Sequence, residues 1–484
     1  MRVIPLIKNN IHIILLGFFI LLYVTYMVTA TFLRHDNFYS GRFDLGNMDQ
    51  TVWNTINGRI FQATDADGTD VVSRLSGHAD FLLILLSPFY LIWESPKMLL
   101  LLQSLAMGFA AIFVFLLAHH SLKNKTVALV LAASYLLNPS INYVNLYDFH
   151  AVSFAPLFIV GAFYFLAIKR LVWFTVFLIL AGLTKENVWM LTGLIGGYAA
   201  WRAKFFSTQF IVGITTVIVS LSSFYYLIWV AIPQARSSPH FALSYYSEFG
   251  DSPSEVIKNI VLSPNRTLSI AFGEEKIEYL RKILLPFGFL PVLSPHILIL
   301  AAPDLFINLL GSNPNLHQIY YQYTATITPF LVAAAVQAIR LMYKKIPKLP
   351  LWIISFYVIA STLYAFYQYG PLPGSKNPNT VMFTMPNPNR QLIKSALAHI
   401  PSGAAVTATN NLAAHLSYRE KIYVIPNGIK NADWVLFLIS DQSGPLYDQY
   451  EQTLVGGLKK DPNFILIEQK DNFWAFKRVA SAEK

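Results

Sequence analysis

Long apolar stretches alternate with short polar ones over the first three quarters of the chain. The apolar stretches cover residues 11–33, 97–119, 126–144, 151–168, 171–184, 187–201, 207–232, 282–293, 296–310, 324–343 and 349–367. A helix needs about 20 apolar residues to cross the hydrocarbon core of a bilayer, and most of these stretches approach that length. The pattern therefore predicts a mainly α, polytopic membrane domain over residues 1–369, with about eleven spans of which the pair at 282–310 is short.

The tail of the chain has a different pattern. From Pro386 onward the apolar runs shorten to strand length, at 404–408, 422–425, 434–439 and 464–468, and helix-like stretches lie between them at 390–399 and 447–459. This alternation is typical of a small soluble α/β domain. We expect that domain to cover residues 387–484 and to fold separately, joined by a linker at 370–386 that is rich in Pro, Asn and Gly.

Lysine and arginine gather between the apolar stretches. The clusters are Arg2 and Lys8, Lys123 and Lys125, Lys169 and Arg170, Arg202 and Lys204, and Lys344, Lys345 and Lys348. When the chain is threaded alternately through a bilayer, every cluster falls on one face, which the positive-inside rule assigns to the cytoplasm. We therefore expect a multi-pass protein of the cytoplasmic membrane with its N-terminus inside. The loops 34–78 and 233–281 and the C-terminal domain would lie outside.

The segment 79–94 needs a separate interpretation, because a true span there would invert the topology of everything after it. Pro88 interrupts its apolar run and Glu94 ends it. Proline breaks a regular helix, so we interpret the segment as a re-entrant or interfacial helix under the first external loop.

Composition excludes several classes of protein. The chain is 55% hydrophobic and 13% charged, and this charged share is about half that of a soluble domain. The net charge of +10 comes without a basic stripe of interleaved aromatics, so we expect no nucleic-acid partner. Cysteine is absent, which excludes disulfides and thiolate metal sites.

Acidic and imidazole side chains gather on the predicted outer face. Asp44 and Asp49 lie among apolar residues of the first loop, where partial burial would raise their pKa and basicity. Asp148 and His150 lie in a turn between two spans, as a polar cap or as a pair that binds a cation. Lys185 and Glu186 lie between two short apolar runs, as an internal ion pair or as a functional site.

Several short motifs together carry a resemblance to a known family. They are Phe43-Asp44-Leu45-Gly46 with Asp49-Gln50, His78, residues 99–103, Asp148-Phe149-His150, Lys185-Glu186-Asn187, Pro303-Asp304 with Asn308-Leu309-Leu310, and, in the tail, His415-Leu416-Ser417 with Arg419 and Ile422-Tyr423 with Pro426. With these motifs the chain resembles predicted multi-pass membrane proteins of bacteria and archaea, a domain of unknown function that is similar to the GT-C membrane glycosyltransferases. The resemblance covers most of the chain.

The resemblance implies a GT-C-like fold whose first large external loop supplies a catalytic carboxylate. It also implies a lipid-linked sugar donor, with the sugar on a polyprenyl phosphate, and an inverting transfer to an envelope acceptor whose identity is unknown. The superfamily often has two acids adjacent or one residue apart, whereas Asp44 and Asp49 are five positions apart. Which of the two is the base therefore stays open.

The roles implied for individual residues follow from this resemblance. Asp44 would be the catalytic base and Asp49 its support or replacement. The substrate-binding residues would be His78, Lys185 and Gln50. The ligands of a divalent cation, Mg²⁺ or Mn²⁺, would be Asp148, His150 and Glu186. No organic cofactor is expected, and the other partners would be membrane lipids.

Two alternatives remain open at this stage. A lipid or sugar transporter (a flippase) also uses buried acids, although we find no matched pair of broken helices in repeated halves. An inactive scaffold for envelope assembly would keep the same charge pattern. The enzyme hypothesis makes one geometric prediction, namely that Asp44, Asp148, His150 and Glu186 converge on one external cavity.

Overall fold

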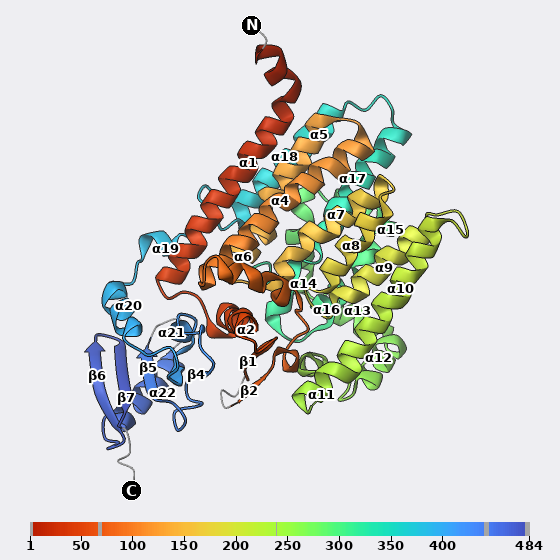
Figure 1. The fold of residues 1–484 in the computed structure, drawn as a ribbon. Coiled ribbons are helices and arrows are strands. Elements are labelled where there is room, and N and C mark those ends of the chain that lie inside the picture. Colours follow the sequence, from red (N-terminus) through yellow and green to blue (C-terminus); the bar gives the residue numbers. More distant parts are fainter. Residues whose placement is uncertain (1–2, 66–69, 239, 440–444, 480–484) are drawn as a thin grey trace.

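The computed structural model describes residues 3–65, 70–238, 240–439 and 445–479. A bundle of helices carries the N-terminus at one end, and a small sheet with its own helices lies at the other end (Figure 1). This architecture confirms the predicted fold class, a polytopic helical protein with a C-terminal α/β domain. Arg2 of the first basic cluster lies outside the described residues.

Long apolar helices form the frame of the bundle. They include α1 (Val3–Asp36), α4 (Pro96–Leu122), α10 (Thr208–Tyr226), α17 (Thr328–Lys345) and α18 (Leu351–Tyr369). Within the described ranges, five helical segments are long and apolar enough to cross a membrane. A sixth span results if α5 (Lys125–Leu136) and α6 (Pro139–Leu146), bent by 44° at their junction, are counted as one. Asn138 caps α6 at this bend, where its Oδ1 accepts from the amide of Ser140 at 2.9 Å.

Shorter apolar helices fill the rest of the bundle. They are α7 (Ala155–Ala167), α8 (Leu171–Gly182), α9 (Val188–Trp201) and a broken segment made of α15 (Pro295–Leu298) and α16 (Ala302–Leu310). Helix α8 has 12 residues and α9 has 14. Helices α9 and α10 pack closely, because a Cβ added at Gly213 would lie 2.7 Å from the carbonyl oxygen of Gly196. Small residues of this kind let membrane helices approach each other.

The predicted span at 282–293 is wrong. Helix α14 (Glu274–Leu284) is amphipathic, and two short 3₁₀ turns follow it at Leu285–Phe287 and Leu290–Leu293. Pro286 and Pro291 prevent a continuous helix, and the chain has positive φ at Gly288 between them. Hydroxyl groups of α18 satisfy the unwound carbonyls, with Thr362 donating to Pro286 at 2.6 Å. Non-helical backbone is tolerated in a membrane protein where such partners exist.

The segment 79–94 adds no span. It forms α3 (Leu82–Leu86) and a 3₁₀ turn, Ser87–Leu91. Before it, the first loop folds into α2 (Asn47–Ile56) and an antiparallel pair of strands, β1 (Gln62–Thr64) and β2 (Val71–Ser73). The second long loop contains α11 (Ile232–Arg236), α12 (Pro253–Leu262) and α13 (Pro264–Ala271). Both loops lie at the end of the bundle that faces the C-terminal domain (Figure 1).

The C-terminal domain is a five-stranded mixed sheet covered on both faces. Its strands are β3 (Val406–Ala408), β4 (Ile422–Val424), β5 (Trp434–Leu438), β6 (Phe464–Lys470) and β7 (Phe473–Arg478), in the order β4-β3-β5-β7-β6. Strands β3, β4 and β5 are parallel, whereas β7 pairs antiparallel with β5 and β6. Alternate residues of β5 face opposite sides, as expected for a strand buried on both faces. Leu436 packs toward α20 (Arg390–Ala398) and α21 (Asn410–Ala413), and Phe437 toward α22 (Pro445–Leu458).

This domain is tied to the first loop, although it was expected to fold separately. Phe38 of the loop belongs to the apolar core that covers one face of the sheet. Gln50 donates from Nε2 to the carbonyl oxygens of Arg419 and Glu420 at 3.1 and 2.9 Å. A Cβ on Gly46 would lie 3.2 Å from the Cα of Ala414, so the two backbones approach closely. Partners so far apart in the chain leave no local sequence signal.

Candidate functional site

The turn between α8 and α9 holds a buried carboxylate, Glu186. Its Oε1 lies 2.9 Å from Nδ1 of His78 and 3.4 Å from Nε2 of His240, and its Oε2 accepts from the amide of Ala79 at 3.0 Å. Burial alone would raise its pKa, but the two imidazoles and Lys185 together hold the pKa of Glu186 well below its usual range. Burial lowers the pKa of His78, and Glu186 acts in the opposite direction.

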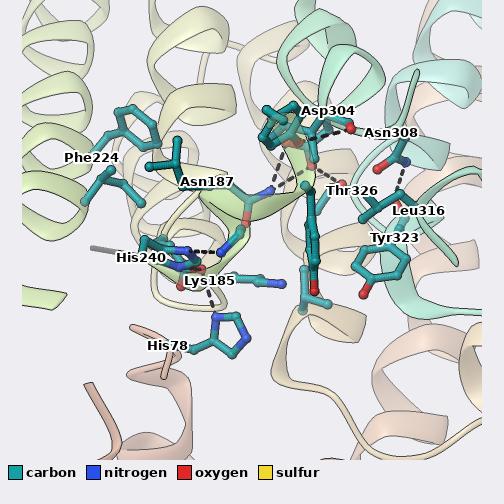
Figure 2. A pocket seen from close by; sticks show the side chains of 18 of the residues that line it. His78, Lys185, Asn187, Phe224, His240, Asp304, Asn308, Leu316, Tyr323 and Thr326 are labelled. Carbon is teal, nitrogen blue, oxygen red and sulfur yellow. Dashed lines mark hydrogen bonds and ion pairs between the residues drawn. The ribbon is translucent and has the colours of Figure 1, made fainter. Parts of the chain in front are cut away.

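Glu186, His78 and His240 have the composition of a metal site. One ligand atom from each residue lies within 4.8 Å of those of the other two. Figure 2 shows both imidazoles beside the turn that carries Lys185. Two imidazoles and a carboxylate suit Zn²⁺ or Mn²⁺ better than Mg²⁺, which prefers oxygen ligands. Of the predicted cation ligands, the structure brings only Glu186 into this cluster.

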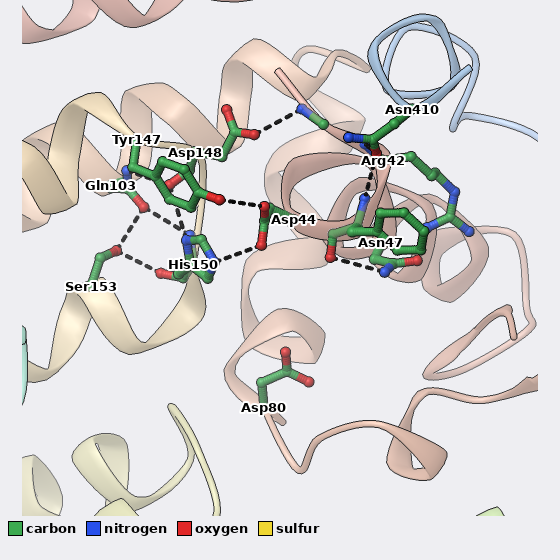
Figure 3. A network of polar contacts seen from close by, with 12 residues as sticks. Arg42, Asp44, Asn47, Asp80, Gln103, Tyr147, Asp148, His150, Ser153 and Asn410 are labelled. Atoms are coloured by element: carbon green, nitrogen blue, oxygen red, sulfur yellow. Dashed lines mark hydrogen bonds and ion pairs between the residues drawn. The ribbon is translucent and has the colours of Figure 1, made fainter. Parts of the chain in front are cut away.

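The second group of polar residues surrounds Asp44. A π-helical turn, Arg42–Gly46, carries this carboxylate at the start of the first loop. The turn is held from two sides, because the amide of Gly41 donates to Oδ2 of Asp148 at 2.8 Å and the amide of Arg42 donates to Oδ1 of Asn410 at 2.7 Å. Asp44 is thus positioned jointly by the membrane domain and the C-terminal domain (Figure 3).

Two side chains of the α6–α7 connection orient the Asp44 carboxylate. Tyr147 donates from its hydroxyl to Oδ2 at 3.1 Å, and Nε2 of His150 lies 3.1 Å from Oδ1 (Figure 3). The ring of His150 stacks on that of Tyr147, and its Nδ1 lies 3.2 Å from the carbonyl oxygen of Asp148. Burial would raise the pKa of Asp44, but His150, Tyr147 and Arg34 together lower it, so the carboxylate is ionised at neutral pH. It keeps 27% of its surface exposed.

Asp148 stabilises the turn that carries Asp44, because it accepts a hydrogen bond from the amide of Gly41. Burial raises the pKa of Asp148 to about 6, whereas Arg34, at 3.7 Å, acts in the opposite direction. The α6–α7 connection itself is fixed by Gln103, whose Oε1 accepts from the amide of His150 at 2.9 Å and from the hydroxyl of Ser153 at 2.8 Å. The environments of Asp44 and Asp148 therefore push their pKa values apart, which is common where two acids have different tasks.

Asp49 and Gln50 lie away from these groups. Asp49 is fully buried and accepts from Tyr90 and from the hydroxyl of Ser417, the latter at 2.6 Å. Burial raises its pKa to about 6. The side chain of Gln50 is also fully buried, and its Oε1 accepts from Arg42 at 2.7 Å. The structure therefore places both residues in the contact between the first loop and the C-terminal domain.

Two adjoining cavities connect Asp44 with Glu186. The first, of about 820 Å³, is lined by Asp44, His150, His78 and Lys185. The second, of about 680 Å³, is lined by Glu186, His78 and Lys185 and has mostly apolar walls. The two cavities share seven lining residues, which are His78, Val152, Lys185, Ser238, Tyr245, Gln322 and Tyr323.

The four residues that were predicted to converge on one cavity are instead divided between two adjoining groups. Asp44, Asp148 and His150 make one network, Glu186 lies in the adjoining cavity, and His78 and Lys185 lie where the two meet. Two residues of these groups were not predicted from the sequence: Tyr147, which precedes the recognised pair, and His240, an isolated histidine in a long polar loop. The neighbours of Tyr147 gave a usable signal, but those of His240 gave none.

A family model described as a predicted membrane protein (DUF2079) matches residues 34–472. The chain belongs to this family. No curated protein matches the DUF2079 chain. Among solved structures, ArnT from Cupriavidus metallidurans, crystallised bound to undecaprenyl phosphate, superposes with a TM-score of 0.50 at 10% sequence identity. The match covers 95% of this chain and 98% of that one, so it extends over the whole fold and supports the GT-C-like architecture.

Proposed function

We propose that this protein is an inverting glycosyltransferase that moves a sugar from a polyprenyl-phosphate donor to an envelope acceptor on the outer face of the cytoplasmic membrane. The observation that supports this best is the ionised Asp44 carboxylate, exposed to a cavity that Lys185 also lines. A carboxylate can accept the proton of the attacking hydroxyl, and a cation can stabilise the departing phosphate.

The proposed reaction needs one base. The acceptor oxygen forms a bond to the anomeric carbon while the bond from that carbon to the phosphate oxygen breaks. Asp44 takes the hydroxyl proton, and the electron pair leaves with the polyprenyl phosphate. Attack from the face opposite to the phosphate inverts the anomeric centre. His150 and Tyr147 each contact one oxygen of Asp44 and so fix the direction from which it accepts the proton.

Lys185 is the proposed phosphate contact. Its Nζ lies 5.9 Å from the ring centroid of Tyr323, and no carboxylate among the described residues forms a salt bridge with it. An ammonium group that forms no direct salt bridge, at the junction of two cavities, can bind a phosphate by charge-assisted hydrogen bonds.

The second cavity fits the lipid part of such a donor. Its apolar wall includes Phe224 of α10, Ile228 and Trp229 just after that helix, Leu243 of the second long loop and Ile307 of α16 (Figure 2 shows part of this wall). An isoprenoid chain needs an apolar surface of this kind close to the phosphate contact. The crystallised ArnT binds a polyprenyl phosphate, which agrees in kind with this proposal.

We further propose that His78, Glu186 and His240 hold a divalent cation. The donor set fits Zn²⁺ or Mn²⁺, as argued above, and a bound ion would supply positive charge beside the phosphate. His78 and His240 would each offer an imidazole nitrogen, and Glu186 a carboxylate whose pKa is held well below its usual range. Metal content of the purified protein, compared with that of His240→Ala, tests the site: an unchanged content in the variant would contradict it.

The proposed outer-face location can be tested by labelling, because the chain contains no cysteine. A single cysteine at Asp65 should react with an impermeant maleimide in intact cells, whereas one at Lys123 should be protected. The reverse pattern would place Asp44 and Lys185 on the cytoplasmic side.

The activity itself requires a search for the donor. Full-length protein in nanodiscs would be incubated with a panel of polyprenyl phosphates that carry radiolabelled sugars, together with membranes of a deletion strain as the source of acceptor. Transfer of label out of the lipid-phosphate fraction, abolished by Asp44→Asn, is the expected result. A lipid that crosses the bilayer of a vesicle with its sugar still attached, at a rate unaffected by Asp44→Asn, would instead support the transporter alternative.

A further inference from the structure

A third cavity, of about 430 Å³, lies at the opposite end of the bundle from the sites described above. Four cations line it, and each comes from a different part of the chain. Lys123 follows α4, Lys169 follows α7, Arg202 follows α9, and Arg340 lies in the last turns of α17. The connections after α4 and α9 lie at the end of the bundle that carries the N-terminus (Figure 1).

The charge of this cavity is not balanced by acids. None of its lining residues is Asp or Glu, and none of its four cations forms a salt bridge with any residue that the structure describes. At the other end of the molecule, by contrast, Arg34, Arg74 and Lys97 each pair with an aspartate. The positive-inside rule explains why cations occur at this end, but it does not require four of them to surround one cavity.

The remaining walls combine polar groups with apolar ones. The polar side chains are His120, Ser121, Tyr198, Gln209 and Gln337, and the apolar ones include Leu117, Phe163, Leu166 and Val336. Next along the chain from Arg202, the side chains of Phe205 and Phe206 are each 73% exposed. Exposed aromatic residues beside basic ones are typical of the boundary between headgroups and acyl chains.

We propose that this basic cavity binds the phosphate of an anionic phospholipid headgroup. Guanidinium groups bind phosphate through paired hydrogen bonds, so Arg202 and Arg340 would be the main contacts. Basic pockets between membrane helices are known to accept such headgroups. The exposed phenylalanines beside Arg202 favour a lipid over a free phosphate ion, because they need acyl chains around them. The site is independent of the Asp44 cavity and of the function proposed for it.

The test measures lipid retention by the full-length protein. Protein reconstituted with equal amounts of phosphatidylglycerol and phosphatidylcholine is extracted into mild detergent, and the bound lipid is quantified by native mass spectrometry. Wild type should retain phosphatidylglycerol preferentially. One cation near a lipid surface contributes roughly a fivefold change in affinity, so the double variant Arg202→Gln/Arg340→Gln should lose about 25-fold.

Matched variants separate this site from general surface charge. Lys345→Gln/Lys348→Gln removes two cations from the same end of the bundle but outside the cavity, and should change retention less than twofold. Arg202→Lys/Arg340→Lys keeps the charge but not the paired hydrogen bonds, so its retention should lie between that of wild type and that of the glutamine variant. An unfolding midpoint of the glutamine variant equal to that of wild type excludes misfolding as the cause of its loss. Equal loss in the two glutamine variants would overturn the proposal. So would glycerol phosphate in solution that displaces the lipid at equal concentration, because the site would then bind a free phosphate.

Discussion

Replacing Asp44 by Asn is the sharpest test of the proposed chemistry, because an amide has nearly the shape of a carboxylate but cannot accept a proton at neutral pH. The substitution keeps an oxygen for one partner, so the hydroxyl of Tyr147 at 3.1 Å can still donate to it. It removes the negative charge that faces Nε2 of His150. The backbone contacts of the turn, from Gly41 to Asp148 and from Arg42 to Asn410, do not involve the Asp44 side chain.

Two magnitudes separate catalysis from stability. General base catalysis contributes about 10²–10⁴-fold to a rate, so transfer should fall by that factor. The lost interaction with His150 is one hydrogen bond of a partly exposed side chain, 27% accessible, and such a bond contributes about 1 kcal/mol to the free energy of unfolding. A loss of that size leaves most of the protein folded. The rate should therefore drop far more than the amount of folded protein.

The assay is transfer of radiolabelled sugar from the polyprenyl-phosphate fraction, measured beside the thermal unfolding midpoint of the same preparation. Asp65→Asn is the matched control, because Asp65 lines the same cavity without being placed at the reacting groups, and its rate should stay within a few-fold of wild type. An Asp44→Asn protein that is folded and transfers sugar at more than about a tenth of the wild-type rate would refute the assignment of Asp44 as the base.

Three further predictions concern His150 and the contact between the first loop and the C-terminal domain. His150→Ala removes a group that lowers the pKa of Asp44, so the acid limb of the pH–rate profile should move to higher pH; an unmoved limb would contradict this. Asp49 has a pKa raised by burial to about 6, above the value near 3.9 of an unfolded chain. It therefore stabilises the fold below about pH 4, and this contribution, on the order of 3 kcal/mol, is lost as the pH rises through 6; unfolding curves of Asp49→Asn should lack that dependence. Gln50→Ala leaves buried partners unsatisfied and should lower the free energy of unfolding by about 3 kcal/mol, with faster proteolysis of the C-terminal domain, whereas Asn57→Ala, at an exposed bond, should have little effect.

Local pattern predicted the parts of this molecule that depend on local properties. Apolar runs indicated the membrane helices, and strand-length runs indicated four of the five strands of the C-terminal sheet. The error at 282–293 arose because hydropathy does not register the effect of Pro286 and Pro291 on helix geometry. The run that became β7 was not recognised, although its partner β6 was.

In the candidate site, too, local pattern indicated some residues, whereas contacts between distant parts of the chain could not be predicted. Asp44, His150 and Glu186 were selected as candidates because each interrupts an apolar stretch at a predicted membrane boundary. Asp49 was assigned to the site on the same grounds, but its partner Ser417 lies 368 positions away, and no pattern near Asp49 indicates that contact. The identity of the neighbour, rather than the residue type, decides whether a carboxylate faces a cavity, as Asp44 does, or holds two domains together, as Asp49 does.

The shortness of α8 and α9 has a consequence for the surrounding membrane. At 1.5 Å per residue these helices are about 18 and 21 Å long, whereas the hydrocarbon core is about 30 Å thick. The neighbouring apolar segment Thr208–Arg236 has 29 residues and is long enough to cross the full thickness. The α8–α9 hairpin is therefore shorter than the hydrocarbon core by roughly 10 Å, and local thinning of the bilayer or flanking polar residues have to accommodate this difference, whereas α10 has no such shortfall. Such a mismatch deforms the bilayer asymmetrically around one molecule, so membrane thickness and acyl-chain length become variables that control where the protein is stable and where it resides.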